Sequence, residues 1–214
     1  MLDMEKAFDR VWHEELIYKL SKSNLPPRLL HIISSFLANR QITVAVEGAL
    51  STSRPVQAGV PQGSCLSPSL YAAYANDVPA LDGVKLALYA DDTAYISTSI
   101  NANHAAAKLQ PTLDALGPWL EKWRLRVNVV KTQAMVTGRR HRPPPPITIL
   151  GETVPWAQIV KYLGVTIDAR LCMNAHVTAT ISKTKSARAQ LRPLLRSQLP
   201  IKTKMPDAIS GIQP

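Results

Sequence analysis

The fold of this chain is decided by residues 84–98, which read VKLALYADDTAYIST. Two apolar runs, residues 84–89 and 93–98, have the composition of short strands, and an aspartate pair separates them. Because neighbouring side chains of a strand point to opposite faces, Asp91 and Asp92 can serve one site only if the backbone turns there. The stretch therefore predicts a β-hairpin that carries both carboxylates at its tip.

The aspartate pair is open to two interpretations. In the first, the carboxylates bond to their own backbone in an Asx-type turn. In the second they bind cations. Two carboxylates a few ångströms apart repel by ~4 kcal/mol at an effective dielectric constant of 20, so both stay ionised only if cations lie between them or water screens them well. Asp3 favours cation binding, since its alternating apolar neighbours predict a short strand that leads into a helix. Three carboxylates from this strand and the hairpin tip would hold two Mg²⁺ ions, or Mn²⁺, about 3.5–4 Å apart.

A further motif spans residues 59–68, GVPQGSCLSP. Its two glycines would let the backbone approach a ligand closely, and Gln62 has a side chain that both donates and accepts. A plain turn before a helix explains the same residues, and no phosphate-loop or dinucleotide-binding pattern is present. Ser67 and Pro68 predict the N-cap and the first position of a helix that ends near Asn76.

Apolar periodicity predicts helices over residues 12–20 and 26–37, whose apolar stripes would face the core. The second stripe consists of Leu29, Ile32, Ile33, Phe36 and Leu37. Pro111 and Pro118 predict a broken helix over residues 101–125, because an interior proline kinks a helix. The other expected elements are a hairpin over 42–57, a strand over 133–137, an exposed connector over 139–146 (RRHRPPPP), a hairpin with strands 147–154 and 159–167, and a basic helix over 175–195. This alternation indicates an α+β fold with an antiparallel sheet and helices on one face.

Composition limits the class of protein. The chain has 214 residues, 46% hydrophobic and 19% charged, which is enough for one globular domain with a core. No run approaches the ~18 apolar residues that a membrane span requires, and no secretory signal is present. Cys65 and Cys172 lack partners at metal-ligand spacing. We therefore expect an intracellular chain with no membrane segment and no structural zinc.

The charge is distributed unevenly along the chain. The formal net charge is +10. Through Glu121 there are nine Lys and Arg residues against twelve Asp and Glu, whereas from Lys122 onward there are sixteen against three. This distribution fits either a solvated basic face or a nucleic-acid-binding tract beside an acidic site.

Five segments in order resemble the motifs of reverse transcriptases, most closely those of non-LTR retrotransposons related to jockey elements. They are DMEKAFDRVW (3–12), GVPQGSCLSPSLYAAYANDVP (59–79), YADD (89–92), WLEKWRLRVNVVKT (119–132) and VKYLGVTID (160–168). The resemblance implies a polymerase palm over residues 1–150, a primer-grip-like hairpin over 151–173, and a partial, basic, thumb-like helix and tail over 174–214. No segment resembles the family's fingers or its endonuclease domain, so we expect a fragment with little or no activity by itself.

The resemblance also implies a catalytic centre. Asp3, Asp91 and Asp92 match the metal-binding aspartates, which hold two Mg²⁺ ions in this family. Lys131 matches a lysine proposed to protonate the leaving pyrophosphate, although a surface lysine explains it equally well. The implied reaction is attack of a DNA primer 3′-hydroxyl on a deoxynucleoside triphosphate, directed by an RNA template.

Substrate contacts follow from the same resemblance. Phe8 matches the aromatic residue that excludes a ribose 2′-hydroxyl, although an ordinary core position explains it as well. Gln62 and Gly63 match residues beside the incoming nucleotide and the template base. The residues that would hold the primer end are Tyr162, Leu163 and Gly164.

Two other functions remain open at this stage. The basic C-terminal part would suit a non-enzymatic, RNA-binding remnant of a transposable element. An RNA-templated RNA polymerase would share the two-metal palm, but Phe8 argues against it. The family resemblance implies work in the nucleus, and no protein partner is indicated by the sequence.

Overall fold

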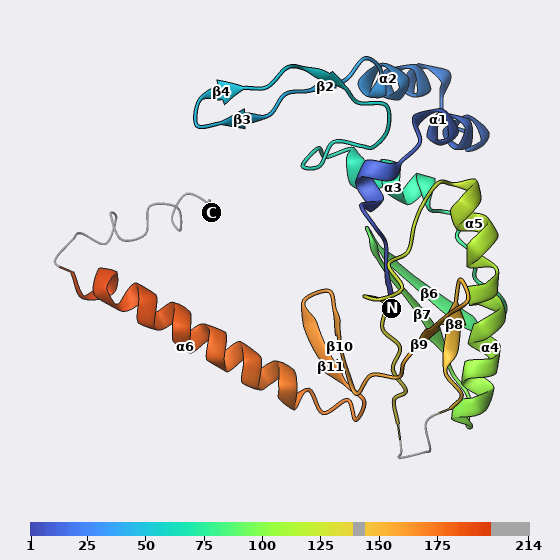
Figure 1. Cartoon of the computed structure of the whole chain (residues 1–214), viewed down its shortest axis with the longest axis vertical. Helices are drawn as coiled ribbons and strands as arrows, with labels where there is room; N and C mark the ends of the chain where they lie inside the picture. Colours follow the sequence, from blue (N-terminus) through green and yellow to red (C-terminus); the bar gives the residue numbers. More distant parts are fainter. Residues whose placement is uncertain (139–143, 198–214) are drawn as a thin grey trace.

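Three antiparallel strands form the central sheet, in the order β1–β7–β6 (Figure 1). They are β1 (Leu2–Asp3), β6 (Val84–Tyr89) and β7 (Asp92–Ser97). The computed structural model describes residues 1–138 and 144–197. Most of the expected connector at 139–146 and the whole tail after residue 197 lie outside the described residues. The hairpin predicted around the aspartate pair is confirmed.

A later segment of the chain runs along the free edge of β1. The backbone N–H groups of Asn128 and Gln133 donate to the carbonyl oxygens of Asp3 and Met1, at 2.8 and 3.0 Å. The strand predicted over residues 133–137 is wrong, because Ala134 forms only one isolated bridge, to Trp156. The two-residue strand β1 is consequently held from both sides.

Helices α4 (Ala102–Asp114) and α5 (Leu116–Lys122) form one column beside this sheet (Figure 1). Helix α4 contacts β6, β7 and β8. The predicted break in the helix is confirmed and lies at Ala115, between the two prolines. Leu113, Leu116 and Leu120 are buried on this column, which places the core between the helices and the sheet.

The N-terminal motif continues into η1 (Ala7–Arg10), α1 (His13–Lys22) and α2 (Pro27–Leu37). Helix α1 buries Leu16 and Leu20, as predicted. The prediction for the second stripe is wrong in part, since Leu29 and Ile32 are 47% and 57% exposed. Helix α2 packs against α1, so its opposite face is left in solvent.

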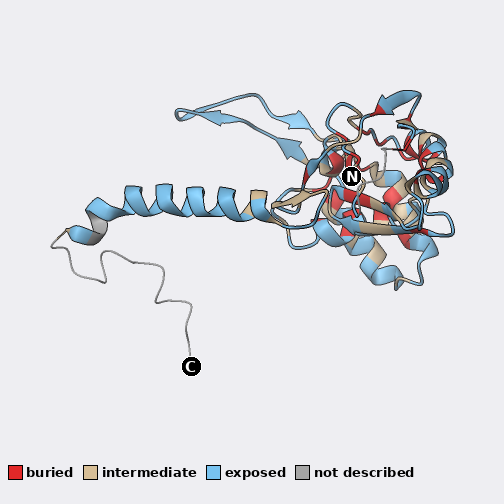
Figure 2. Ribbon diagram, turned by 90° about the horizontal axis from the view of Figure 1, so that it is seen from below, coloured by how far each residue is buried: buried red, intermediate tan, exposed pale blue. Residues whose placement is uncertain are grey.

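A hairpin arm extends away from the helices. It consists of β2 (Gln41–Ile42), β3 (Ala45–Val46), β4 (Ala49–Leu50) and β5 (Arg54–Pro55), in which β2 pairs with β5 and β3 with β4. The predicted hairpin and its turn at Glu47 and Gly48 are confirmed. Figure 2 shows the arm exposed along its length.

Two small hairpins follow the helical column. Strand β8 (Ile147–Ile149) pairs with β9 (Glu152–Val154), and β10 (Ile159–Tyr162) pairs with β11 (Val165–Asp168). The prediction of one hairpin made from both ranges is wrong. Each range turns back on itself instead, at Leu150–Gly151 and at Leu163–Gly164, where both residues take a positive φ.

Helix α6 (Asn174–Arg196) projects from the body as an isolated rod (Figures 1 and 2). The basic helix predicted over 175–195 is confirmed, and it contains no Asp or Glu. None of the helices within residues 1–138 and 144–197 combines the length and the apolarity that crossing a bilayer demands.

Candidate active site

The backbone brings Asp3 and Asp92 together. They are Cα partners in the antiparallel pairing of β1 with β7, and Tyr89 of β6 is the partner of Asp92 on its other side. Residues directly opposite each other in an antiparallel pair direct their side chains to the same face of the sheet. The two carboxylates therefore lie on one face, although they come from distant parts of the chain.

The turn between β6 and β7 places the remaining aspartate beside this pair. Ala90 and Asp91 form a two-residue loop, and Ala90 takes a left-handed φ of 53°. That conformation is unfavourable for a residue with a Cβ and is concentrated at functional sites. The tight turn keeps Asp91 next to Asp92 and away from the regular alternation of the strand.

The electrostatics of Asp92 show that the three carboxylates interact. The pKa of Asp92 lies above its ordinary value because the carboxyl group is partly desolvated, and because Asp91 and Asp3 carry like charge close by. A divalent cation would remove this repulsion, so the donor set fits hard cations such as Mg²⁺.

The side chains of the three aspartates do not form a complete metal-binding site in the structure. Within residues 1–138 and 144–197, no three His, Cys, Asp or Glu side chains lie close enough together to hold a metal ion. The β1–β7 register brings the carboxylates to one place, and their mutual repulsion opposes a closer approach.

Phe8 lies in η1 and stacks on Tyr71 of helix α3 (Ser67–Tyr74), with ring centroids 5.1 Å apart. Phe8 is half-buried, whereas Tyr71 is buried. Burial raises the pKa of the Tyr71 phenol, and the negative charge of Asp91 raises it further. Tyr71 thus connects Phe8 with the acidic hairpin tip, and the sequence analysis did not single it out for this role.

The glycine-containing loop at residues 59–63 is fastened to the same N-terminal motif. Val60 N–H donates to the Phe8 carbonyl and Gly59 N–H to the Val11 carbonyl, both at 2.8 Å. The Gln62 amide donates to Asp9 Oδ1 at 3.3 Å. Gln62 and Gly63 themselves are exposed and stand one turn before α3. The loop is therefore more than a spacer, because it is held against η1 by three hydrogen bonds.

Gly59 anchors this loop through its carbonyl oxygen. Its carbonyl accepts from the Arg40 guanidinium at 3.2 Å and lies 2.7 Å from His13 Nε2. Neither His13 nor Arg40 belongs to the predicted site, and no pattern in the sequence connects them with the glycine. Ser67 differs from the prediction too, because its hydroxyl donates to the Pro61 carbonyl at 2.6 Å and does not cap the helix.

Lys131 lies in a turn beside β1. Its N–H donates to Asn128 Oδ1 at 3.1 Å, and Asn128 in turn donates to the Asp3 carbonyl. The structure thus brings the Lys131 backbone close to the first aspartate and leaves its side chain exposed.

The predicted primer-binding residues lie elsewhere on the molecule. Tyr162 ends β10, and Leu163 and Gly164 form the two-residue turn into β11. A cavity of about 620 Å³ lies between this hairpin and the central sheet, lined by Tyr162 on one side and by Ala87 and Ala94 on the other. The structure therefore places Tyr162 on the wall of a cavity that the central sheet also lines, and Leu163 and Gly164 in the exposed turn beside it.

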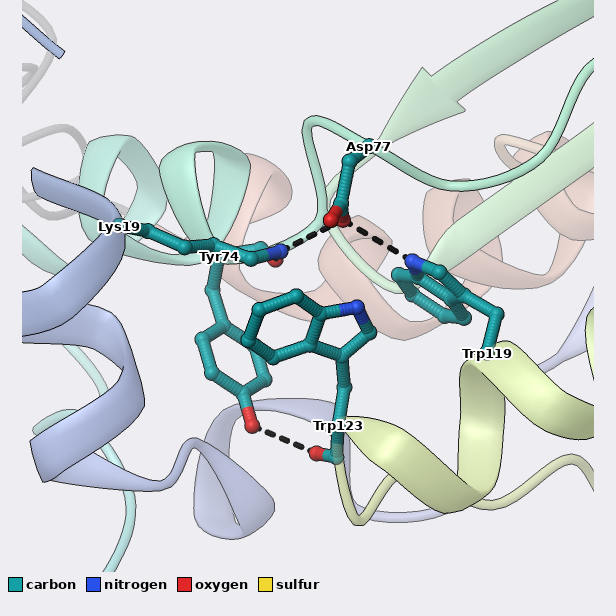
Figure 3. A network of polar contacts seen from close by, with 5 residues as sticks. All are labelled: Lys19, Tyr74, Asp77, Trp119 and Trp123. Atoms are coloured by element: carbon teal, nitrogen blue, oxygen red, sulfur yellow. Dashed lines mark hydrogen bonds and ion pairs between the residues drawn. The ribbon is translucent and has the colours of Figure 1, made fainter. Parts of the chain in front are cut away.

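A polar network anchors the C-terminal end of α3 (Figure 3). Asp77 Oδ1 accepts from Lys19 at 2.5 Å and from the Trp119 indole at 2.9 Å. Lys19 also donates to the Tyr74 carbonyl, and its ammonium lies 3.5 Å from the centre of the Trp123 ring. The Tyr74 hydroxyl donates to the Trp123 carbonyl at 2.5 Å. The network joins α1, the C-terminal end of α3 and α5.

Comparisons with known proteins agree with this arrangement. A family model described as reverse transcriptase (RNA-dependent DNA polymerase) matches residues 1–167. The chain is 37% identical over 214 residues to the RNA-directed DNA polymerase from mobile element jockey of Drosophila melanogaster, covering 95% of this chain and 23% of that protein. It is 39% identical over 186 residues to the protein of the same name from Drosophila funebris, covering 83% and 20%. It is 36% identical over 211 residues to the probable RNA-directed DNA polymerase from transposon BS of Drosophila melanogaster, covering 91% and 22%.

The chain spans between a fifth and a quarter of the length of these relatives. The family model nevertheless covers most of the chain, and the sequence motifs that resemble non-LTR retrotransposon enzymes lie almost entirely within the matched residues. The resemblance found in the sequence is confirmed, and the chain belongs to the reverse transcriptase family of RNA-dependent DNA polymerases.

Proposed function

We propose that this chain carries the nucleotidyl-transfer centre of a reverse transcriptase, which adds deoxynucleotides to a DNA primer on an RNA template. The observation that supports it is the pairing of Asp3 with Asp92, with Asp91 in the adjoining turn. Proteins of this family generally use divalent metal ions. Two bound Mg²⁺ ions would lower the barrier by stabilising the charge on the attacking and leaving oxygens.

The residues of the chain would divide the work as follows. Asp3, Asp91 and Asp92 would hold the metal ions, and the Phe8 ring would lie under the incoming sugar and exclude a 2′-hydroxyl. Gln62 and Gly63 would contact the nucleotide and the template base, since both are exposed on a loop that is tied to η1. Lys131 would give a proton to the departing pyrophosphate.

The proposal extends to the organisation of the chain. Residues 1–150 would form the palm, 151–173 the primer-grip hairpin and 174–214 the beginning of a thumb. Residues Tyr162–Gly164 would hold the primer end. The two turn residues of that hairpin, Leu163 and Gly164, are exposed and accessible to nucleic acid. We also propose that the protein acts in the nucleus.

Two measurements on the 214-residue chain test the proposal. The first is the melting temperature with and without Mg²⁺, because a ligand that binds the folded state raises it. We expect Mg²⁺ to raise the melting temperature of the wild type and to leave Asp91→Asn unchanged. Asp82→Asn, at an exposed position outside the site, is the matched control and should respond like the wild type.

The second measurement is primer extension on an RNA template with Mg²⁺ or Mn²⁺. Extension, even if slow, should disappear in Asp91→Asn and persist in Asp82→Asn. A chain that neither gains stability from Mg²⁺ nor extends a primer contradicts the proposed function.

A second candidate function is nucleic-acid binding without catalysis. Helix α6 favours it, because the helix carries Lys and Arg residues from Lys183 to Arg196, lacks acidic residues and exposes most of its described side chains. RNA affinity would then fall steeply with salt, because each phosphate contact releases counterions. Affinity that is equal in the wild type and Asp91→Asn, without any extension, would favour this function over the first.

A further inference from the structure

The ring of Phe8 has one aromatic partner in the described part of the chain, and that partner is Tyr71. The two rings are stacked, with centroids 5.1 Å apart and an interplanar angle of 29°. Tyr71 is 3% exposed, so its ring has little freedom to move, whereas Phe8 is half-buried and borders solvent. The position of the Phe8 ring therefore depends on its stacking against the Tyr71 ring.

The helix that carries Tyr71 is held firmly by a polar network. One turn further along α3, Tyr74 belongs to the network with Lys19, Asp77, Trp119 and Trp123 (Figure 3). Tyr74 is fully buried. This network fixes α3 against α1 and α5, and it thereby fixes the backbone from which the Tyr71 ring projects.

The hydroxyl of Tyr71 adds no anchoring of its own. Within residues 1–138 and 144–197 it makes no hydrogen bond, and after burial the charge of Asp91 has the largest effect on its pKa. The ring is consequently the part of Tyr71 that supports Phe8, and removal of the hydroxyl alone should leave the stack in place.

We propose that Tyr71 is a positioning residue for sugar discrimination, whose buried ring holds Phe8 under the incoming nucleotide. The inference rests on the proposed function and adds to it, since it assigns selectivity to a pair of rings. An unsupported Phe8 side chain can rotate away, which leaves room for a ribose 2′-hydroxyl. Loss of the ring at position 71 should therefore favour ribonucleotides without removing the catalytic aspartates.

The first test uses fluorine NMR on the full chain labelled with 4-fluorophenylalanine. The chain has two phenylalanines, Phe8 and Phe36, so each resonance can be assigned by substitution. Tyr71→Leu should shift and broaden the Phe8 resonance and leave that of Phe36 in place, whereas Tyr71→Phe should leave both. Tyr95→Leu, the same substitution at a half-buried tyrosine of β7, is the matched control and should not disturb Phe8.

The second test measures the ratio of kcat/KM for deoxynucleotides to that for ribonucleotides in primer extension. Tyr71→Leu should lower the ratio about three- to tenfold, the range that an aromatic pair is worth, mainly through a lower KM for the ribonucleotide. Tyr71→Phe should retain the wild-type ratio. A merely structural role would lower kcat/KM for both substrates equally and leave the ratio unchanged.

The outcomes separate the two proposals. An unmoved Phe8 resonance in Tyr71→Leu, or a moved resonance with an unchanged ratio, overturns the inference and leaves the proposed function intact. A wild type that neither gains stability from Mg²⁺ nor incorporates either kind of nucleotide overturns the proposed function, and the inference falls with it even if the resonance moves.

Discussion

Gly59 lies against the backbone of Asp9 so closely that a Cβ on the glycine would stand 2.9 Å from the Asp9 Cα and 3.0 Å from its carbonyl oxygen. The glycine has a φ of +91°, which residues with a side chain rarely adopt. The contact seats the loop at residues 59–63 on η1. Whatever the loop binds is thereby placed next to Phe8.

Gly59→Ala should destabilise the chain by about 2–5 kcal/mol. The left-handed φ contributes about 1–2 kcal/mol and the clash with Asp9 adds a further overpacking penalty of about 1–3 kcal/mol. Gly48→Ala is the control, since Gly48 has a φ of +86° but nothing within 4 Å of its Cβ position. Urea unfolding should show the larger loss for Gly59→Ala, and equal losses would contradict the contact.

Neutralising Asp3 should change how stability depends on pH. Because the pKa of folded Asp92 is raised, its stabilising contribution is present below the ordinary value of 3.8 and is lost as pH rises through the folded pKa. Asp3→Asn removes one source of repulsion, so the variant should gain stability relative to the wild type as the pH rises above 3.8 and through the pKa of folded Asp92. Urea unfolding across that range, with carboxyl ¹³C titration of Asp92, checks both the direction and the cause. A constant difference between the two proteins would show that Asp3 does not act on Asp92.

Asp77→Ala should destabilise the chain by roughly 1–3 kcal/mol, because two donors lose their acceptor at once. Those donors are the Lys19 ammonium, whose side chain is 9% exposed, and the Trp119 indole. Burial already lowers the pKa of Lys19, and loss of Asp77 should lower it further. The destabilisation should then shrink as the pH rises toward 10.5, since the neutral amine is easier to bury. Asp82→Ala, at an exposed carboxylate, should have almost no effect in the same thermal or urea melts.

Asp168 should control the elbow between β11 and α6. Its carboxylate accepts from the backbone N–H groups of Arg170, Cys172 and Met173 and from the Cys172 thiol. Asp168→Ala should speed tryptic cleavage after the exposed Arg170, and Asp168→Asn should have an intermediate effect because one acceptor oxygen remains. Cys172→Ser, which keeps the three backbone bonds, should be cut at the wild-type rate. Equal cleavage of all four proteins would show that the carboxylate does not hold the elbow.

The same elbow should loosen in acid. The Cys172 thiol and the backbone donors hold the pKa of Asp168 below its ordinary value, so the stabilisation is present above pH 3.8 and is lost as the pH falls through the lowered pKa. Amide hydrogen exchange of Met173, whose N–H bonds the carboxylate at 2.8 Å, reports this change. Its protection relative to Asp168→Ala should disappear as the pH falls, and protection that persists or grows in acid would contradict the expected sign.

The sequence predicted best what depends on neighbouring residues. The hairpin over residues 84–98 was predictable because its two apolar runs and its turn are contiguous, and the break between α4 and α5 because two prolines lie in one helical stretch. The exposure of Leu29 and Ile32 was not predictable. A helical stripe has the same spacing whether or not another element covers it, and here α2 packs against α1 while Leu29 and Ile32 remain in solvent.

The pairing of the strands was not predictable from the sequence either. The ranges 147–154 and 159–167 look alike as strands, and only the positive φ values at Leu150 and Leu163 reveal that each folds back on itself. The role of Tyr71 was not predictable for a similar reason. Its spacing is that of a core residue, and its relation to Phe8 depends on a contact between two distant segments.

The position of β1 between β7 and the segment that ends with Gln133 has a consequence for the order of folding. Both neighbours of this two-residue strand, β7 and the segment that ends with Gln133, emerge from the ribosome long after Asp3 has been synthesised. Contacts of such wide sequence separation form late and slowly in folding. A growing chain therefore leaves Asp3 without its strand partner until β7 has been made, and a nonsense codon before residue 92 would leave that carboxylate without a scaffold.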